Sequence, residues 1–130
     1  MADDERRSRV RDALRSAQLD AVACALPMNV LMLSGYWPVL GTAVAICTSD
    51  GKIGLAVPEG EKAVAELAQP ATVELFPSGS LDKLDSVSAL IQPALRNLCR
   101  KIGSSQMRVG IEAGAQELPI GYSGIHFYAD

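Results

Sequence analysis

The chain has 130 residues, a length that fits a single domain able to bury a hydrophobic core without disulfides or metal ions. Hydrophobic residues make up 48% of it and charged residues 21%, an ordinary globular composition that excludes extensive disorder. The net charge of −3 disfavours a nucleic-acid partner, because a mildly acidic surface does not attract phosphate backbones.

The start of the chain and its cysteines indicate where the protein works. The chain begins Met-Ala-Asp-Asp-Glu, which lacks the positive charge of a secretory signal peptide. The stretch between Asp20 and Asp50 is uncharged and long enough to cross a bilayer, but prolines and glycines interrupt it repeatedly. Three scattered cysteines suit a reducing compartment. We therefore expect a cytoplasmic protein with no membrane segment.

The first third of the chain predicts a helix, a strand and a helical turn. Apolar residues recur with helical spacing over 4–18, which predicts an amphipathic helix there. The short apolar run 21–26 predicts a strand covered on both faces. Asn29 is a good N-cap residue, so one helical turn is expected at 30–33, ended by Gly35 in the left-handed conformation.

A β-hairpin is the firmest local prediction. The segments 42–48 and 53–57 are both apolar and β-prone, and Asp50-Gly51 lies between them. Asp-Gly is a strong signal for a two-residue hairpin loop, because its backbone twist matches that of the flanking strands. We expect these two strands to pair antiparallel.

The second half alternates helices with strands. A helix is expected between Glu59 and Pro70, followed by a strand over 72–76. A long amphipathic helix then ends at Lys101, and Pro93 inside it should kink or split it.

The remaining elements complete the prediction of the fold class. A last strand is expected at 108–111, and 125–128 forms either a strand or a connector. The alternation of helices and strands argues for a sheet with helices on both faces, and the hairpin requires that sheet to be mixed. The fold class is therefore α/β, a three-layer α/β/α arrangement with a mixed β-sheet.

Residues for metal or acid–base catalysis are missing from the sequence. His126 is the single histidine, and it is expected to be a surface or packing residue. No HExxH or paired CxxC pattern occurs, and no glycine-rich phosphate-binding motif occurs either. We expect no catalytic residue and no metal site in this chain, which is typical of a binding, regulatory or assembly module.

Five short segments carry a resemblance to a known family. The helix is followed by Leu19-Asp20-Ala21, then by Asn29 and Leu33-Ser34-Gly35-Tyr36, then by Asp50-Gly51 and finally by Val109-Gly110-Ile111-Glu112. Their order and spacing resemble the N-terminal domain of the creatinase, prolidase and aminopeptidase P family, over about 6–112. No single segment is decisive, and the stretch after Glu112 departs from the family pattern.

The resemblance implies a fold and a role. Residues 1–130 would form one creatinase/prolidase N-terminal domain with a ribonuclease H-like mixed sheet. Catalysis would belong to a pita-bread domain that is absent from this chain, where carboxylates and a histidine hold two divalent metal ions (Mn, Co or Zn). This chain would then be a non-catalytic accessory and dimerisation domain of an Xaa-Pro dipeptidase-like metallopeptidase.

The resemblance also implies partners and site residues. The partners would be the chain's own catalytic domain, a second copy in a homodimer, and the parent's peptide substrate. Asn29, Tyr36 and Trp37 would lie at the substrate entrance or at an interface, because the segment 36–40 is an uncharged, partly aromatic loop. Tyr36 and Trp37 are alternatively core aromatic residues, with Trp37 beneath the hairpin.

Two other functions remain open at this point. The chain could be a free-standing module of the same fold that binds a small molecule or peptide. It could also be the N-terminal domain of a creatinase-like amidinohydrolase that acts on a guanidino substrate. The coding sequence beyond Asp130 would distinguish a free-standing module from a domain of an enzyme, because only the enzyme continues into a catalytic domain.

Overall fold

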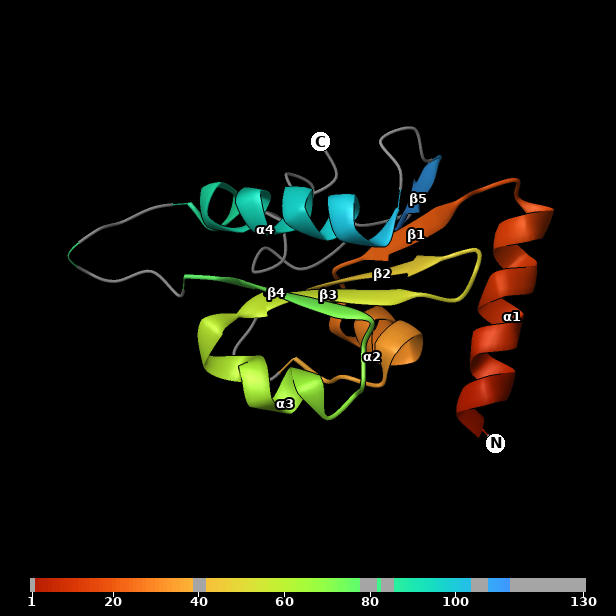
Figure 1. The fold of residues 1–130 in the computed structure, drawn as a ribbon, viewed down its shortest axis with the longest axis horizontal. Coiled ribbons are helices and arrows are strands. Elements are labelled where there is room, and N and C mark those ends of the chain that lie inside the picture. The colour runs from red at the N-terminus through yellow and green to blue at the C-terminus, as the bar shows by residue number, and fades with distance from the viewer. Residues whose placement is uncertain (1, 39–41, 78–81, 83–85, 104–107, 113–130) are drawn as a thin grey trace.

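The computed structural model describes residues 2–38, 42–77, 82, 86–103 and 108–112. These segments form one mixed β-sheet flanked by helices, in the order of elements that the sequence predicts. Figure 1 shows the arrangement. The residues 125–128, which were expected to form a strand or a connector, lie outside the described part of the chain, as does His126.

The sheet has five strands in the order β4-β3-β2-β1-β5. The neighbours β1–β2 and β2–β3 run antiparallel, while β3–β4 and β1–β5 run parallel, so that the sheet is mixed as predicted. The three central strands are the most apolar ones, and β4 and β5 form the two edges. The strand bounds are Ala21–Cys24 for β1, Val44–Thr48 for β2, Ile53–Pro58 for β3, Thr72–Phe76 for β4 and Val109–Ile111 for β5.

Helices cover both faces of the sheet, which confirms the three-layer prediction. Helix α4 (Val87–Ile102) lies on one face, and α2 (Pro27–Ser34) and α3 (Lys62–Glu66) lie on the other, as Figure 1 shows. A 3₁₀ turn, η1 (Glu59–Glu61), leads into α3. Helix α1 (Ala2–Ser16) stands beside the end of the sheet where the β2–β3 hairpin turns.

Each face of the sheet has its own hydrophobic core. On the α4 side the cluster is centred on Ile91 and Leu98, which are fully buried. Gly54 lets α4 approach the sheet closely, because a Cβ atom there would meet Leu98 Cδ1 at 2.6 Å. On the other side Val30 of α2 and Leu55 of β3 are fully buried.

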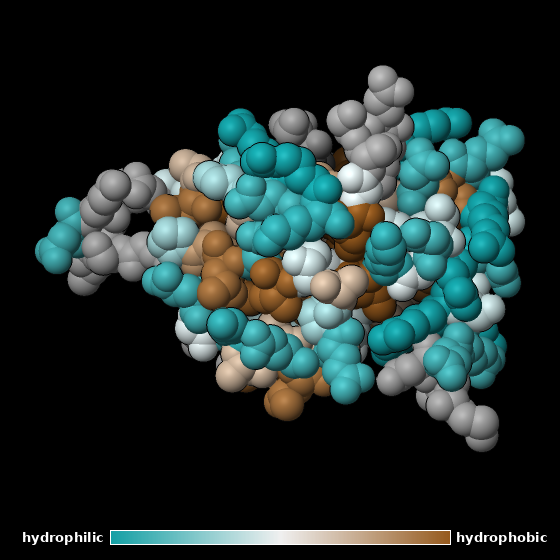
Figure 2. Space-filling view, in the orientation of Figure 1, coloured by the Kyte–Doolittle hydropathy of each residue, from teal (hydrophilic) through white to brown (hydrophobic). Residues whose placement is uncertain are grey.

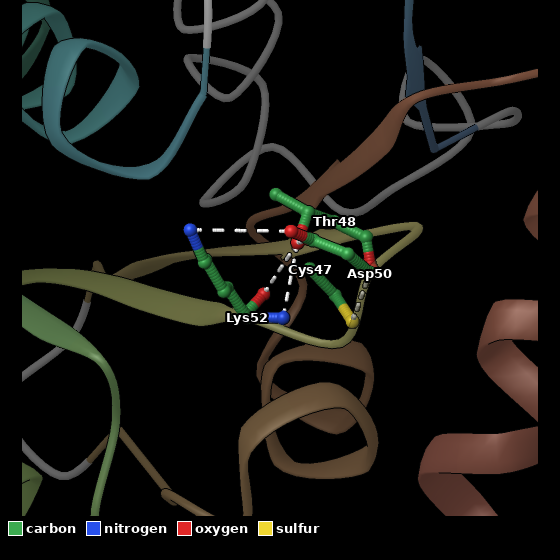
Figure 3. Close-up of polar contacts among 4 residues, drawn as sticks. All are labelled: Cys47, Thr48, Asp50 and Lys52. Atoms are coloured by element: carbon green, nitrogen blue, oxygen red, sulfur yellow. Dashed lines mark hydrogen bonds and ion pairs between the residues drawn. The ribbon is translucent and has the colours of Figure 1, made fainter.

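The hairpin forms as predicted, but its loop is longer. Thr48 N donates to Lys52 O at 2.9 Å, so the loop contains Ser49, Asp50 and Gly51 instead of two residues. Gly51 has φ 93°, a conformation that a glycine adopts without strain. Figure 3 shows how the Thr48 hydroxyl bonds to the Asp50 carboxylate and accepts from Lys52 N at 3.0 Å. The extra residue is therefore stabilised by side-chain contacts.

All four helices differ from their predictions, and α3 covers only Lys62–Glu66 of the span expected between Glu59 and Pro70. Helix α1 ends two residues before the expected boundary, and α2 is a full helix instead of a single turn. Helix α4 continues through Pro93 as one element, so the expected split does not occur. Its apolar stripe packs along the sheet on both sides of the proline, and this burial outweighs the lost backbone hydrogen bond.

Candidate functional site

The Glu112 carboxylate joins two segments that are far apart in the sequence. It lies just after β5 and accepts hydrogen bonds from Leu26 N at 2.9 Å and Ala25 N at 3.1 Å. It also accepts from Asn29 Nδ2 at 2.9 Å. These three donors lie at the end of β1 and in the first turn of α2. Glu112 therefore connects the end of the last strand to the beginning of α2.

The start of α2 differs from the N-cap that the sequence predicted. Asn29 was expected to cap the helix, but α2 begins earlier, at Pro27, with Leu26 as its N-cap residue. Leucine has no side-chain oxygen to accept from the first amides of the helix. Glu112 accepts from Leu26 N and Ala25 N, just before the first turn, and its negative charge suits the positive end of the helix dipole. Asn29 instead donates its own amide to the same carboxylate.

Tyr36 follows α2 and is buried, in agreement with the alternative that it is a core aromatic residue. Its residue exposure is only 2%, and its hydroxyl donates to Glu61 Oε2 at 2.5 Å. Glu61 belongs to η1 and is equally buried. Burial, and then the hydrogen bond and charge of Glu61, raise the pKa of Tyr36 above its ordinary value. The pair therefore connects the end of α2 with the start of α3.

The turn between α2 and Tyr36 is fixed by local contacts. Gly35 has φ 81° and its N–H donates to Leu31 O, which is the left-handed terminator that the sequence predicted. The Ser34 hydroxyl donates to Val30 O at 2.6 Å and accepts from Tyr36 N at 3.0 Å. These contacts direct Tyr36 into the core.

Trp37 lies on the surface, with 49% of the residue exposed. The alternative of a buried core tryptophan is therefore wrong. The segment 36–40 thus separates into a buried Tyr36 and an exposed Trp37, while 39–41 lie outside the described residues. Of the expected site residues, Asn29 is hydrogen-bonded to Glu112 and Tyr36 to Glu61, while Trp37 is half exposed to solvent. The structure does not bring these three side chains into one cluster.

Helix α2 presents an apolar face to solvent beside its buried one. Met28, Leu31 and Met32 recur at helical spacing and are 75%, 38% and 46% exposed. A helix that is apolar all round is usually covered on every side, so this outer face is suited to a contact with another surface. We refer to Met28, Leu31 and Met32 as the α2 outer face. The helical spacing of the two methionines and the leucine is visible in the sequence, but the single helical turn expected at 30–33 was too short to reveal this face.

The three cysteines are not activated. Burial raises the pKa of Cys24 to about 12, and the nearby negative charge of Glu112 adds to this effect. Burial likewise raises the pKa of Cys47 and of Cys99. A thiolate is the reactive form of cysteine, so these thiols suit packing and not nucleophilic chemistry.

Metal ligands do not gather in the part of the chain that the structure describes. Within it, no group of three or more His, Cys, Asp or Glu residues could hold a metal ion. The two divalent ions implied by the resemblance therefore have no fitting ligand set among these residues. In the same segments no helix combines the length and the apolar character needed to cross a membrane.

Comparison with known proteins identifies the class of the domain. The fold is an α/β domain with a mixed sheet. The Creatinase/Prolidase N-terminal domain family matches residues 6–123, and the chain belongs to this family. Both the predicted family and the predicted fold class are thus confirmed. A search of curated proteins finds no match.

Solved structures show the same fold at low sequence identity. The N-terminal domain of an Xaa-Pro dipeptidase from Streptococcus pyogenes is similar, with a TM-score of 0.61 and 14% identity over 94% of this chain and 83% of that one. The corresponding domain from Lactobacillus brevis gives a TM-score of 0.60 and 14% identity, over 95% of this chain and 84% of that one.

A longer enzyme contains the same domain. The prolidase from Pyrococcus horikoshii has a TM-score of 0.55 and 22% identity over 95% of this chain, but this chain spans only 29% of that enzyme. In that prolidase the domain is thus part of a longer polypeptide.

Replacing Glu112 by Ala tests the cap on α2. The change leaves Ala25 N and Leu26 N without their acceptor, and we expect it to lower the free energy of unfolding by about 1–3 kcal/mol. Glu66→Ala is the matched control, because Glu66 is exposed and makes only a 3.9 Å ion pair with Lys62, worth about 1 kcal/mol or less. Urea unfolding measures both. Equal losses for the two variants would contradict the cap.

The Tyr36–Glu61 pair predicts a loss of stability at high pH. The folded-state pKa of Tyr36 is raised, so its contribution is complete below the unfolded value of about 10 and is lost as the pH rises above it. Tyr36→Phe has no ionisable group at this position and lacks that loss. We expect the unfolding free energy of the wild type to fall more steeply than that of Tyr36→Phe from about pH 10 upward. Parallel urea-unfolding curves for the two proteins would contradict the assignment, since lysines and thiols titrate equally in both.

Proposed function

We propose that this chain is the non-catalytic N-terminal domain of an Xaa-Pro dipeptidase-like metallopeptidase, where it supports the catalytic domain and helps to shape substrate access. The family match supports this proposal, as does the presence of the same fold within the longer Pyrococcus horikoshii prolidase. In this proposal the parent is a cytoplasmic hydrolase that forms a homodimer, and its two divalent ions, Mn, Co or Zn, lie in the catalytic domain.

The position of Glu112 is the observation that carries the proposal. Its carboxylate is held by the N-terminal end of α2, so the end of β5 lies beside that helix. Met28, the most exposed residue of the α2 outer face, lies one position after Pro27 at this same end. Among the described residues this apolar surface is uncovered, and it is therefore suited to contact the catalytic domain.

Trp37 is the residue best placed to influence substrate access. It is half exposed and follows the C-terminal end of α2, while its neighbour Tyr36 is fixed in the core by Glu61. A surface tryptophan on a well-anchored segment can form a rigid aromatic wall beside a neighbouring domain. Asn29 and Tyr36 would act indirectly, by positioning α2 and the segment that carries Trp37.

The proposal that metal binding and catalysis belong to the catalytic domain can be tested by comparing the 130-residue chain with a longer polypeptide. We expect the 130-residue chain to bind no Mn²⁺ by calorimetry and to cleave no Xaa-Pro dipeptide, because its described residues offer no carboxylate–histidine cluster. A polypeptide that continues into the catalytic domain should do both. Manganese-dependent dipeptidase activity from the 130-residue chain would overturn the proposal. Activity of the longer protein on guanidino substrates alone would favour the creatinase-like alternative.

Trp37→Ala in the longer enzyme tests the role in substrate access. Because the interaction would be made equally with substrate and transition state, its loss should raise KM by about tenfold and change kcat little. The melting temperature should change little, because half of Trp37 is already exposed. Val64→Ala is a matched control, as an exposed apolar residue on α3. A large fall in melting temperature with unchanged kinetics would contradict the role and make Trp37 a packing residue.

A further inference from the structure

The outer edge of the sheet at β4 exposes backbone groups that can pair with another strand. Strand β4 ends the strand order, and none of the other described strands pairs with it on its outer side. Thr48 N donates to Lys52 O, so the backbone groups of Lys52 point toward β2. Backbone groups alternate in direction along a strand, and those of the next residue, Ile53, therefore point toward β4. Ala71 N donates to Ile53 O at 2.7 Å, in agreement with that direction. By the same alternation, the backbone N–H and C=O of Leu55 also point toward β4.

The register of the parallel pair then identifies the free groups. Leu55 is opposite Val73, and in a parallel ladder a residue bonds to the two residues that flank its partner. Thr72 and Glu74 therefore use their backbone groups toward β3. Val73 and Leu75, which alternate with them, direct their N–H and C=O groups to the open side. These two residues make the edge a template for a further strand.

Strand β4 lacks the common features that prevent edge pairing. Its sequence, Thr-Val-Glu-Leu-Phe, contains no proline or lysine and favours extended structure. The one charged side chain, Glu74, is turned to α4, where its Oε1 lies 2.5 Å from Lys101 Nζ and only 13% of the side chain is exposed. Figure 2 shows this face of the molecule, with hydrophobic residues between the hydrophilic surfaces over α4 and α3.

Charges on both sides of the edge favour a second copy of the same chain. Above the edge, toward α4, lies the pair of Glu74 and Lys101. Below it, a groove of about 570 Å³ runs between β4 and α3, and Lys62 and Glu66 line it with an ion pair of 3.9 Å. Each flank thus carries one positive and one negative charge. Two such edges do not repel each other, and a lysine of one copy can approach a carboxylate of the other.

Symmetry and charge together select a register. A two-fold axis makes the two β4 strands antiparallel. The residues that form hydrogen-bonded pairs must then have backbone groups that point away from β3. An axis at Glu74 would set two carboxylates against each other, which is destabilising. An axis at Val73 instead places each Glu74 opposite the Thr72 hydroxyl of the other copy and brings the outward N–H of Leu75 to the Ala71 carbonyl, while the Ala71 N–H keeps its bond to Ile53 O. The second arrangement joins the outward groups of the two Val73 residues without a like-charge contact.

We propose that two copies of this chain associate through antiparallel pairing of β4, with the axis at Val73, to form one continuous sheet. The contact is short of the roughly 800 Å² per partner that a stable interface buries, so the dimer is weak and depends on concentration. The proposal deepens the homodimer of the proposed function by assigning its surface. Its test uses the 130-residue chain alone, so it can fail while the catalytic assays succeed.

Leu75→Pro and Leu75→Ala separate backbone pairing from side-chain contact. Proline removes the outward N–H of Leu75 but leaves the bonds of Thr72, Glu74 and Phe76 to β3, and proline is tolerated at such edge positions. We expect sedimentation equilibrium to show a dimer whose Kd rises at least about tenfold in Leu75→Pro, since each copy loses a donor. Leu75→Ala keeps the N–H and should raise Kd less than about threefold. Circular dichroism checks that both variants are folded.

Amide exchange on the unmodified chain gives a second measurement that needs no variant. Exchange of the Val73 and Leu75 amides, followed by NMR, should slow as the protein concentration rises. Exchange that does not depend on concentration, or a strict monomer at all concentrations, would overturn the proposal. An equal effect of Leu75→Pro and Leu75→Ala would also overturn it. So would a dimer that survives Leu75→Pro and dissociates in Met32→Lys, which would move the contact to the α2 outer face.

Discussion

The Glu112 carboxylate is the contact on which the relation between strand β5 and helix α2 depends. The N–H groups of Ala25 and Leu26 come just before the first turn of α2, and amides without an acceptor are costly where water is excluded. Glu112 accepts from both of them and from Asn29 Nδ2, across 83 to 87 positions in the sequence. One carboxylate thus holds the start of α2 and the side chain of Asn29 beside the end of β5.

The anchored helix divides the surface of the domain into regions with different roles. On one side lie the exposed α2 outer face and Trp37, which in the proposed function contact the catalytic domain. On the other, the β4 edge lies at the opposite end of the strand order from β5 and depends on backbone groups. Because the two surfaces are separate, a domain of this family can in principle support a neighbouring domain and a second copy at once.

Local signals in the sequence were sufficient for most of the fold but not for the site. Hydrophobic spacing and Asp-Gly identified the order of elements, because both act between near neighbours. The extra hairpin residue depends on how Thr48 contacts Lys52, which spacing alone does not reveal. The direction of Tyr36 depends on Glu61, and the role of Glu112 depends on α2; both pairs are distant in sequence. Family resemblance pointed to Asn29 and Glu112 separately, but only the structure joins them.

The parallel edges of the sheet have a consequence for biosynthesis. Strand β1 is made early, yet its outer neighbour β5 is the last described strand, with Ala21 opposite Val109. A ribosome must therefore release nearly the whole domain before β1 gains its second partner, whereas the hairpin partner β2 emerges soon after β1. During that interval the nascent chain exposes the bonding groups of an apolar strand, which invites wrong pairing. Pairing of the described sheet is thus completed by β5, next to the place where Glu112 fixes α2.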